Sequence, residues 1–381
     1  MKGTILGIEK NLEETILNFL KGGLEKGCFD AVITPHRVPS GDSFAYLLIN
    51  DKSILEGAFP LSPVIPVQGA KAISSLTRKG NASKKILVIM HPCEIRATIE
   101  LLKLKQVSLG NLFLMSFDCP GVIPLSDYIE DPGKNDQISQ DNYQNWEDIS
   151  IRPICKICTE FSSGPADLHI GLLGADTGKM FLIPLTSEGE RIMKAMDLKI
   201  EDSLDRWERE VEKLKKEREA KRYEAHEVLK SNVEGSQKLL ETFSQCINCH
   251  NCMRVCPVCY CRQCYFDSDA FKLPPENFIN RAKKKGSLRL PADTLLFHLG
   301  RMSHMILSCV TCGTCEDACP MSIPVSQVFS LVADRTQRLF NYKPGSSKEE
   351  PLPVVIYKEE ELHDVEKPYS EIYAKRGEKN A

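Results

Sequence analysis

The N-terminal half of the sequence alternates short apolar runs with amphipathic stretches. Apolar residues recur at helical spacing over 12–24, and an apolar run follows at 29–33. Further on, residues 85–90 and 111–115 have the composition of buried strands, and a helical stretch at 94–104 separates them. Two strands joined through one helix form a crossover, and such strands run parallel. The pattern therefore predicts an α/β domain with a largely parallel sheet.

The remainder of this domain is less regular. Residues 131–148 are polar and indicate a loop. Strand-like segments follow at 166–170 and 180–185. We therefore expect one domain over residues 1–200.

A highly charged segment comes next, and we assign it residues 201–235. Nineteen of the thirty residues from Glu201 to Lys230 are charged, and four apolar residues keep a three-four spacing: Leu204, Trp207, Val211 and Leu214. This pattern predicts a long, solvated helix that docks by a narrow stripe. Its expected role is a spacer or arm, and the alternative is a docking helix for a partner.

The C-terminal part divides into a domain and a tail. Residues 236–340 are mostly helical by pattern, including a helix expected over 291–305. Residues 341–381 lack periodicity and contain several prolines, so they are expected to be extended or disordered unless they wrap a partner.

Charge, hydrophobicity and cysteine content exclude several classes of protein. A net charge of −3 and a pI near 6.3 exclude a globally basic nucleic-acid binder. No stretch approaches the roughly 18 apolar residues of a membrane span, and the sequence predicts a cytoplasmic protein without a signal peptide. Sixteen cysteines are present, eleven of them between Cys246 and Cys319. In a reducing compartment, such clustering favours metal binding over disulfides.

The C-terminal cysteines form a repeat with an offset of 63 residues. The two copies are Cys246-x-x-Cys249-x-x-Cys252-x-x-x-Cys256-Pro257 and Cys309-x-x-Cys312-x-x-Cys315-x-x-x-Cys319-Pro320. This spacing predicts two [4Fe–4S] clusters, in which the fourth cysteine of each motif binds the other cluster. The expected ligand sets are Cys246, Cys249, Cys252 and Cys319 for the first cluster, and Cys309, Cys312, Cys315 and Cys256 for the second. Structural zinc is the alternative, although zinc sites usually use two Cys-x-x-Cys pairs.

The offset is long, and a helix is expected between the motifs. In both respects this domain resembles the α-helical ferredoxin domains of heterodisulfide reductase and succinate dehydrogenase iron–sulfur subunits. Three further thiols follow the first motif: Cys259, Cys261 and Cys264. They are candidates for an alternative cluster ligand or for an additional metal such as zinc, and they are equally compatible with buried or spare cysteines.

The first domain contains a second candidate metal site. Cys93 follows one predicted strand and Cys119 follows the parallel strand, so both lie at carboxyl ends, where open α/β sheets place their ligands. With Cys155 and Cys158 from the next loop they provide four thiolates, from which we predict a third [4Fe–4S] cluster. An isolated Cys-x-x-Cys is also a redox or zinc motif. Cys28 is expected to be a buried core residue.

The motifs of the first domain resemble a known family. Residues 89–97 (IMHPCEIRA), 117–121 (FDCPG), 152–158 (RPICKIC) and 166–171 (ADLHIG) are similar to the β subunits of deazaflavin-dependent hydrogenases and dehydrogenases. The likeness spans roughly residues 10–195. The C-terminal two-cluster domain, with the run from Cys256 to Cys264, makes the chain most similar to the formate dehydrogenase branch of this family.

This resemblance implies an FAD in the first domain, beside the cluster at Cys93, Cys119, Cys155 and Cys158. By analogy we place FAD near Gly69, Lys71, His91, Arg96, Asp167 and Gly171. The sequence departs from the family at His91, where the family often has Thr before Pro-Cys.

The resemblance implies an oxidoreductase subunit that passes electrons between a catalytic dehydrogenase or hydrogenase partner, the clusters, FAD and a deazaflavin coenzyme. We recognise no catalytic residues for formate or hydrogen chemistry, so that chemistry belongs to the partner. One alternative is an adaptor that links a dehydrogenase or hydrogenase to a heterodisulfide-reductase-like complex without deazaflavin chemistry. Another is a zinc-stabilised interaction scaffold. No nucleic-acid partner is expected.

Overall fold

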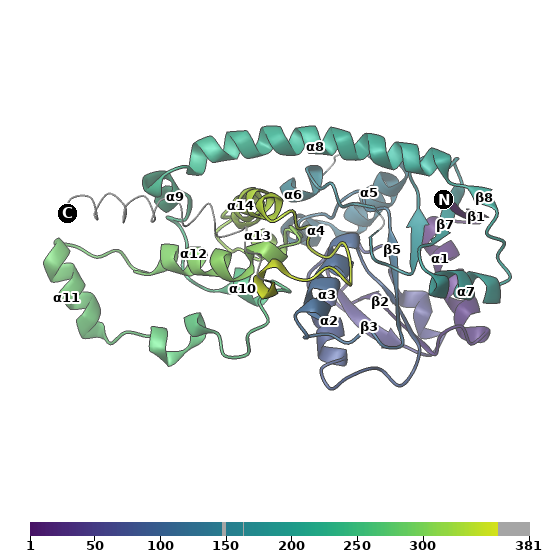
Figure 1. Ribbon diagram of the computed structural model, residues 1–381, viewed down its shortest axis with the longest axis horizontal. Helices are drawn as coiled ribbons and strands as arrows, with labels where there is room; N and C mark the ends of the chain where they lie inside the picture. The colour runs from purple at the N-terminus through teal and green to yellow at the C-terminus, as the bar shows by residue number, and fades with distance from the viewer. Residues whose placement is uncertain (147–149, 163, 357–381) are drawn as a thin grey trace, which may run out of the picture.

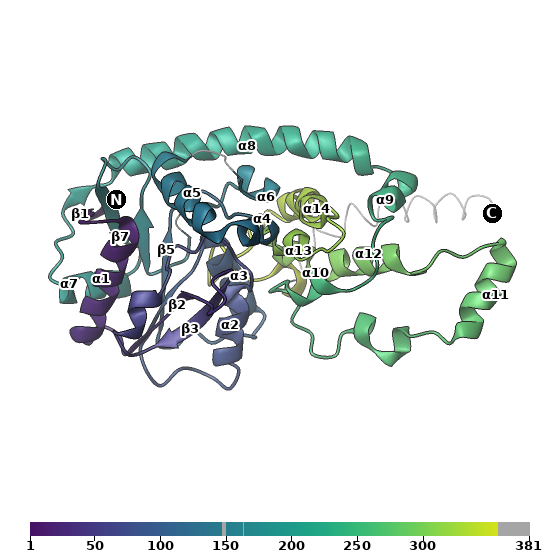
Figure 2. The ribbon, with the colours of Figure 1, turned by 180° about the vertical axis from the view of Figure 1, so that it is seen from behind.

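The computed structural model describes residues 1–146, 150–162 and 164–356. An N-terminal α/β half and a C-terminal helical half lie side by side, and the long helix α8 (Asp205–Val233) runs along both (Figures 1 and 2). Within the described ranges, no helix is both long enough and apolar enough to cross a membrane.

The N-terminal half contains an eight-stranded sheet of order β3-β2-β4-β5-β6-β7-β1-β8 among the described residues. The central strands are parallel: β2 (Ala31–Arg37), β4 (Ile86–Ile89), β5 (Leu112–Phe117) and β6 (Leu168–Gly171). The flanking strands pair antiparallel: β3 (Phe44–Ile49), β7 (Lys179–Pro184), β1 (Lys2–Gly7) and β8 (Asp202–Ser203). The expected parallel arrangement thus holds for the centre of the sheet, and the whole sheet is mixed.

Helices cover both faces of the sheet. Leu87 and Ile89 of β4 face a core that includes α1 (Leu12–Glu25) and α7 (Ser187–Ala195). Ile86 and Val88 face the opposite core, which includes α2 (Gly69–Leu76) and α3 (Pro92–Lys103). Because successive side chains of a strand point to opposite faces, a fully apolar strand is needed between two helical layers.

The predicted crossover is confirmed. Strand β4, helix α3 and strand β5 follow one another, and Leu87 pairs in parallel register with Phe113. Helix α3 begins at Pro92, two residues before the predicted start, because proline is favoured in the first turn of a helix. The Glu94 side chain caps this helix by accepting from the backbone N–H of His91 at 3.1 Å.

The loop predicted over residues 131–148 is wrong for most of its length. Residues Pro132–Asn145 form helix α5, and residues 147–149 lie outside the described residues. Asp131 caps this helix by accepting from Lys134 N at 3.0 Å, and Pro132 occupies its first position. The buried face of the helix is largely polar and includes Asn135, Ser139 and Asn142. The apolar periodicity that identifies a helix was therefore missing.

Helix α8 docks by the predicted stripe. Leu204 and Trp207 are buried in a small apolar cluster, and Val211 and Leu214 pack against it. Two polar residues of α8 extend the contact. Arg218 is buried against the N-terminal half, and His226 is hydrogen-bonded to Ser330 of the C-terminal half at 3.1 Å. The helix therefore contacts both halves.

The C-terminal half is helical, as expected. Phe243, Phe297 and Phe329 lie at its core. Its helices are α9 (Ser236–Thr242), α10 (Asn251–Arg254), α11 (Pro275–Lys285), α12 (Thr294–Met305), α13 (Thr314–Asp317) and α14 (Val325–Leu339). Helix α11 has no buried residue and extends away from the body (Figure 1).

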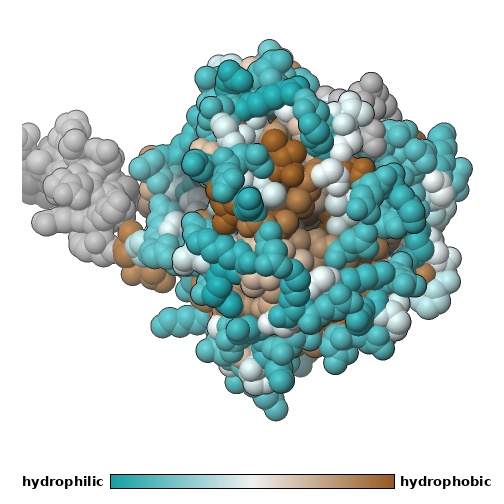
Figure 3. Space-filling model, turned by 90° about the vertical axis from the view of Figure 1, so that its right-hand side faces the viewer, coloured by the Kyte–Doolittle hydropathy of each residue, from teal (hydrophilic) through white to brown (hydrophobic). Residues whose placement is uncertain are grey.

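Short helices complete the secondary structure. The α-helices are α4 (Leu125–Glu130) and α6 (Pro153–Lys156), and the 3-10 helices are Ile54–Gly57, Tyr265–Asp267, Asp269–Phe271, Ile306–Ser308 and Pro353–Val355. The end of the molecule that carries β1, β8 and α7 has an apolar centre bordered by hydrophilic side chains (Figure 3).

The described part of the predicted tail packs on helix α3. Glu100 accepts hydrogen bonds from Tyr342 Oη at 2.6 Å and from Gly345 N at 2.7 Å. Gly345 has a φ of +68°, and a Cβ there would lie 2.3 Å from the carbonyl oxygen of Arg96, so only glycine fits. The chain beyond the C-terminal half thus returns to the N-terminal half, and residues 357–381 lie outside the described residues.

Candidate functional site

Four thiols of the first half line one cavity. Cys93 lies in the first turn of α3, Cys119 follows β5, and Cys155 and Cys158 come from α6 and the turn after it. The carboxyl ends of the adjacent parallel strands β4 and β5 bring the first two together. The structure thus gathers the four residues that the sequence assigned to a third cluster.

Burial raises the pKa of three of these thiols, Cys93, Cys119 and Cys155, so they resist ionisation in the absence of a metal. Burial, and then neighbouring groups that include Cys119 and Cys155, raise the pKa of Cys93 well above its usual value. Burial raises the pKa of Cys155 to about 11. Cysteine binds metal as a thiolate, so an electropositive centre is needed to hold Cys93, Cys119 and Cys155 ionised. An iron–sulfur cluster supplies that charge, and the donor set fits one.

His91 contacts this thiol group. Its Nε2 lies 3.1 Å from the Ser62 carbonyl oxygen and donates to it, which leaves Nδ1 as an acceptor 3.3 Å from Cys119 Sγ. Burial lowers the pKa of His91 to about 3, so the ring is neutral. Its ring also packs edge-on against Phe117 with 4.8 Å between centroids. His91 is therefore a neutral polar contact to a predicted ligand.

Asp118 fixes the position of the neighbouring Cys119. Its carboxylate accepts from His169 Nε2 and Trp207 Nε1, both at 2.9 Å. It also accepts from the Ser162 hydroxyl and from the backbone N–H groups of Leu172 at 2.7 Å and Leu173 at 3.0 Å. Burial opposes ionisation, but these donors, led by His169, lower the pKa of Asp118. A buried carboxylate thus joins β5, β6 and α8 behind the thiols.

Two buried arginines surround the same loop. Arg218 of α8 is 3% exposed and donates to the carbonyl oxygens of Pro120 at 3.1 Å and Cys158 at 3.4 Å. Arg152 donates to the Cys312 carbonyl at 3.2 Å and to the Asp317 carboxylate at 2.6 Å. Neither contact was predictable from the sequence, because both join segments far apart in the chain.

The first C-terminal thiol group brings two motifs together. Burial, and then the nearby thiols of Cys246, Cys319 and Cys249, raise the pKa of Cys252 to about 11. Cys319 belongs to the second motif, so the predicted crossed set of four lies together. His298 Nε2 is 3.4 Å from Cys246 Sγ, and its ring stacks on Phe243 with 4.0 Å between centroids.

The second C-terminal thiol group shows the same crossing. Burial raises the pKa of Cys315 well above its usual value, and Cys312, Cys256 and Cys309 raise it further. Cys312 also lines the cavity of the first-half thiols, together with Thr311. The three groups therefore form a row, with the second C-terminal group in the middle.

The three unassigned thiols lie around one cavity with Arg301. Cys259 is hydrogen-bonded to Cys256, the Cys264 thiol lies 3.5 Å from Met253 Sδ, and Cys261 is exposed. In the described part of the chain, no three or more His, Cys, Asp or Glu side chains are arranged to hold a single metal ion. A [4Fe–4S] cluster is a different case, because its four thiolates bind four separate irons.

The residues placed near FAD by analogy are dispersed. His91 lies among the thiols, and Gly69 N donates to Glu94 Oε1 at 2.6 Å. Lys71 Nζ donates to the Arg254 carbonyl oxygen across the two halves. Arg96 donates to the carbonyl oxygens of Pro344 at 2.9 Å and Val310 at 3.3 Å.

The last two of these residues have structural contacts as well. Asp167 accepts from Leu114 N and from the Thr186 hydroxyl, both at 2.8 Å, at the amino end of β6. A Cβ on Gly171 would lie 2.9 Å from Trp207 Nε1. These contacts do not favour a cofactor role for Asp167 or Gly171.

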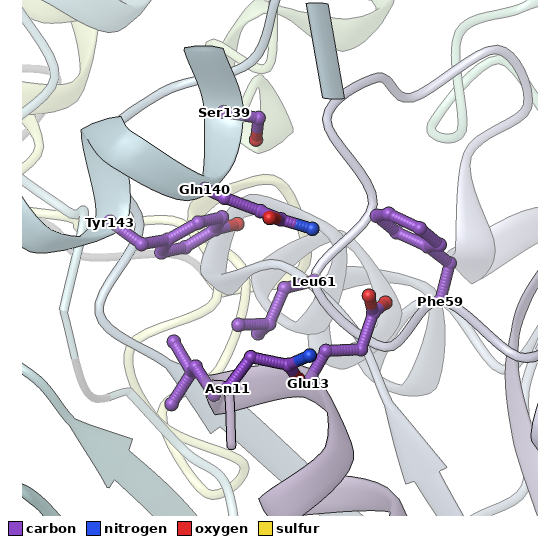
Figure 4. A pocket seen from close by; sticks show the side chains of 8 residues that line it. Asn11, Glu13, Phe59, Leu61, Ser139, Gln140 and Tyr143 are labelled. Atoms are coloured by element: carbon purple, nitrogen blue, oxygen red, sulfur yellow. The ribbon is translucent and has the colours of Figure 1, made fainter. Parts of the chain in front are cut away.

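A cavity that the sequence did not reveal lies at the carboxyl edge of the sheet. Asn11, Glu13, Phe59, Leu61, Ser139, Gln140 and Tyr143 line it (Figure 4), together with Leu12. It shares Asn11, Glu13 and Phe59 with a groove of about 610 Å³ that includes His36 and Arg37 at the end of β2. Open α/β sheets place their ligands at the carboxyl ends of strands, and this rule, which identified Cys93 and Cys119, also applies to Arg37. Tyr143 was missed because it lies on helix α5.

This cavity is connected to the thiols by ring contacts. Tyr143 packs edge-on against Phe117 with 6.0 Å between centroids, and Phe117 packs against His91. Among the described residues, Tyr143 Oη and Glu13 Oε1 are buried without a hydrogen-bond partner. Unsatisfied buried polar atoms beside a groove are typical of a site for a polar ligand.

The chain is similar to several known proteins. Residues 242–323 match the family model of a 4Fe-4S dicluster domain. Among solved structures, the chain is similar to one in the F420-reducing [NiFe] hydrogenase complex from Methanosarcina barkeri, with a TM-score of 0.44 and 15% identity over 62% of this chain and 94% of that chain.

Two curated relatives are similar over most of their length. The chain is 26% identical over 355 residues to the F420-dependent formate dehydrogenase subunit beta of Methanocaldococcus jannaschii, which covers 84% of this chain and 89% of the relative. It is 27% identical over 370 residues to the F420-dependent formate dehydrogenase 1 subunit beta of Methanococcus maripaludis, which covers 86% and 89%. The chain is therefore similar over most of its length to the β subunits of F420-dependent formate dehydrogenases, which are oxidoreductase subunits, and its residues 242–323 match a 4Fe-4S dicluster domain.

Proposed function

We propose that this protein is the electron-transfer β subunit of a deazaflavin-dependent formate dehydrogenase. In this proposal the three thiol groups hold three [4Fe–4S] clusters, with ligands Cys246, Cys249, Cys252 and Cys319; Cys309, Cys312, Cys315 and Cys256; and Cys93, Cys119, Cys155 and Cys158. A partner subunit oxidises formate, and electrons pass through this chain to the deazaflavin coenzyme.

The observation that carries the proposal is that Cys312 lies next to the thiols of the first half. This residue belongs to the second C-terminal group and also lines the cavity of Cys93 and Cys119. The same two groups are close enough for Cys312 to raise the pKa of Cys93. Neighbouring metal centres that follow one another within the protein are what a path for single electrons requires.

We infer that FAD binds in the groove beside Tyr143 and Glu13, at the end of this row. Arg37 at the rim of the groove can pair with the anionic phosphates of FAD, and Phe59 and Tyr143 can pack against its aromatic rings. A bound flavin exchanges a hydride with one partner and single electrons with another. His91, Phe117 and Tyr143 then lie between the third cluster and the flavin. Of the six residues named by analogy, His91 is the one this placement retains.

Anaerobic purification with analysis of iron, sulfide, zinc and flavin tests the proposal. Three clusters predict about twelve iron atoms per chain, and one flavin should be present. Predominantly zinc with no flavin would instead support the interaction scaffold. Variants test the flavin placement: Tyr143→Ala should lower flavin content while iron stays near twelve, and Asp167→Asn should leave flavin content unchanged.

Deazaflavin chemistry is tested separately. Reduced deazaflavin coenzyme is mixed with the purified protein, and the flavin absorbance is followed by stopped-flow spectroscopy. Bleaching of the flavin supports the proposal. Absence of bleaching in protein with full iron and flavin content would favour the adaptor that links a dehydrogenase to a heterodisulfide-reductase-like complex.

A further inference from the structure

Arg301 of helix α12 is a buried cation without a conventional partner. It is 2% exposed, and it ranks among the largest fully buried side chains. Its three guanidinium nitrogens have no hydrogen-bonded oxygen or nitrogen acceptor among the described residues, and Arg301 interacts with the sulfur of Cys259, where it contributes to lowering the pKa of that thiol. Its guanidinium carbon lies 4.9 Å from the ring centroid of Phe329 and 5.9 Å from that of Phe297. These ring faces satisfy only a small part of a guanidinium group with five N–H donors.

The polar neighbours of Arg301 are thiols from both C-terminal groups. Burial acts to lower the pKa of this arginine, but Cys252, Cys256, Cys259 and Cys315 together raise it. Cys252 belongs to the first ligand set, whereas Cys256 and Cys315 belong to the second. Arg301 is therefore near thiols of both sets and lines one cavity with Cys259.

An isolated buried guanidinium is strongly unfavourable unless negative charge and hydrogen-bond acceptors surround it. The thiolates and sulfides of two [4Fe–4S] clusters supply both, because each cluster with four thiolates is negatively charged. The unsatisfied N–H groups of Arg301 thus fit two neighbouring clusters.

We propose that Arg301 is a positioning residue that stabilises the reduced forms of both C-terminal clusters and raises their reduction potentials. This inference rests on the proposed function, since it assumes the two clusters. Reduction adds negative charge to each cluster, so a fixed cation between them favours the reduced state. The interaction is strong because the site is buried and salt screens it little. A cation placed between two clusters also reduces their mutual repulsion when both are reduced.

The test is a redox titration of the purified protein followed by electron paramagnetic resonance, with iron content measured for each variant. In Arg301→Met the positive charge is lost and the side-chain length is largely kept. We expect the reduction equilibrium of both C-terminal clusters to become at least tenfold less favourable, which for a one-electron couple is about 59 mV more negative. The third cluster should keep its potential. Unchanged C-terminal potentials at full iron content, or an equal shift of all three clusters, would overturn the proposal.

Two further variants separate charge from packing. Arg301→Lys keeps the charge and should restore most of the lost potential. Arg281→Met removes one positive charge from the exposed surface of α11, where Arg281 is 45% exposed, and should leave all potentials unchanged. A shift in Arg281→Met as large as that in Arg301→Met would attribute the effect to net charge and contradict a specific role.

The experiment remains decisive if Arg301→Met fails to assemble its clusters. Full iron content in Arg301→Lys together with loss of iron in Arg301→Met supports a requirement for the charge. Loss of iron in both variants shows that the guanidinium shape is needed for packing and overturns the proposal. A wild-type protein without C-terminal clusters would instead contradict the proposed function, and iron analysis of the wild type distinguishes the two failures.

Discussion

Arg152 donates to the Asp317 carboxylate at 2.6 Å and thereby joins the two halves of the protein beside their cysteine-containing loops. Arg152 precedes Cys155 by three residues, and Asp317 precedes Cys319 by two. The side chains are only 3% and 8% exposed. The same guanidinium group donates to the carbonyl oxygens of Cys312 and Ile65. This ion pair therefore holds the second C-terminal thiol group against the first half.

We predict that Asp317→Ala loosens this junction. The variant leaves the Arg152 cation buried and unpaired, which typically costs about 3–5 kcal/mol. Urea unfolding should show the loss, and electron transfer between the C-terminal clusters and the third cluster should slow. The double variant Arg152→Met/Asp317→Leu should recover most of the stability, because it leaves no uncompensated charge. Equal instability of the single and double variants would show that the ion pair itself is not the cause.

Crossed ligation predicts the outcome of Cys256→Ser. Although Cys256 belongs to the first motif, this variant should damage the cluster of Cys309, Cys312 and Cys315, because the thiol of Cys256 lies among them. Electron paramagnetic resonance of the reduced protein measures each cluster. Cys261→Ser is the matched control, since Cys261 is an exposed thiol of the following loop. Loss of only the cluster at Cys246, Cys249 and Cys252 would refute the assignment.

Glu13 predicts a pH dependence of stability. Burial, followed by Asp136, raises its pKa from 4.5 to about 8, and Arg37 opposes the shift. A raised pKa means that the folded state binds the proton more tightly than the unfolded state. The resulting stabilisation is fully present below about pH 4.5, declines as the pH rises, and is lost above about pH 8.

Substitution of Glu13 tests this dependence. Glu13→Gln should flatten the decline of the apparent unfolding temperature between these pH values, measured at a fixed heating rate. Glu14→Gln removes the adjacent carboxyl, which is paired with Lys10 at 2.9 Å, and serves as the control. An undiminished decline in Glu13→Gln would assign the pH dependence to other groups.

Asp118 predicts a selective defect at the third cluster. Asp118→Asn replaces one acceptor oxygen by an N–H₂ group and removes the charge, so several of the five donors lose their partner. Each lost bond to a charged group is worth about 1.5–3 kcal/mol. The signal of the third cluster should weaken on mild heating before the C-terminal signals do. Asp176→Asn is the surface control, and simultaneous loss of all three signals would indicate general unfolding instead.

The local features of the molecule were largely predictable. The crossover that carries Cys93 and Cys119 follows from two apolar strands and the helix between them, and the spacing of the C-terminal motifs identifies thiols that the fold does bring together. The strand-end rule placed the first-half thiols at one edge, because parallel strands share that edge.

The remaining features depend on contacts between distant segments. Helix α5 was missed because its buried face is polar, and with it Tyr143 was missed. Arg301 lies in the helix that the sequence did predict, yet nothing in its neighbours along the chain distinguishes it from a surface arginine. Arg301 is buried near thiols from two motifs that are far apart in the sequence. The cavity at Glu13 is likewise lined by residues of three separate segments: α1, α5 and the segment after β3. The sequence pattern did not predict that these segments lie together.

Helix α8 has a mechanical consequence for electron transfer. Its 29 residues span roughly 43 Å, and Trp207 and His226 anchor it to opposite halves of the protein. The helix thus bridges the junction of the two halves and restrains their relative movement. Because the rate of electron tunnelling falls exponentially with distance, a fixed separation gives a constant rate. In the proposed electron path, the two halves would therefore exchange electrons without a swinging motion.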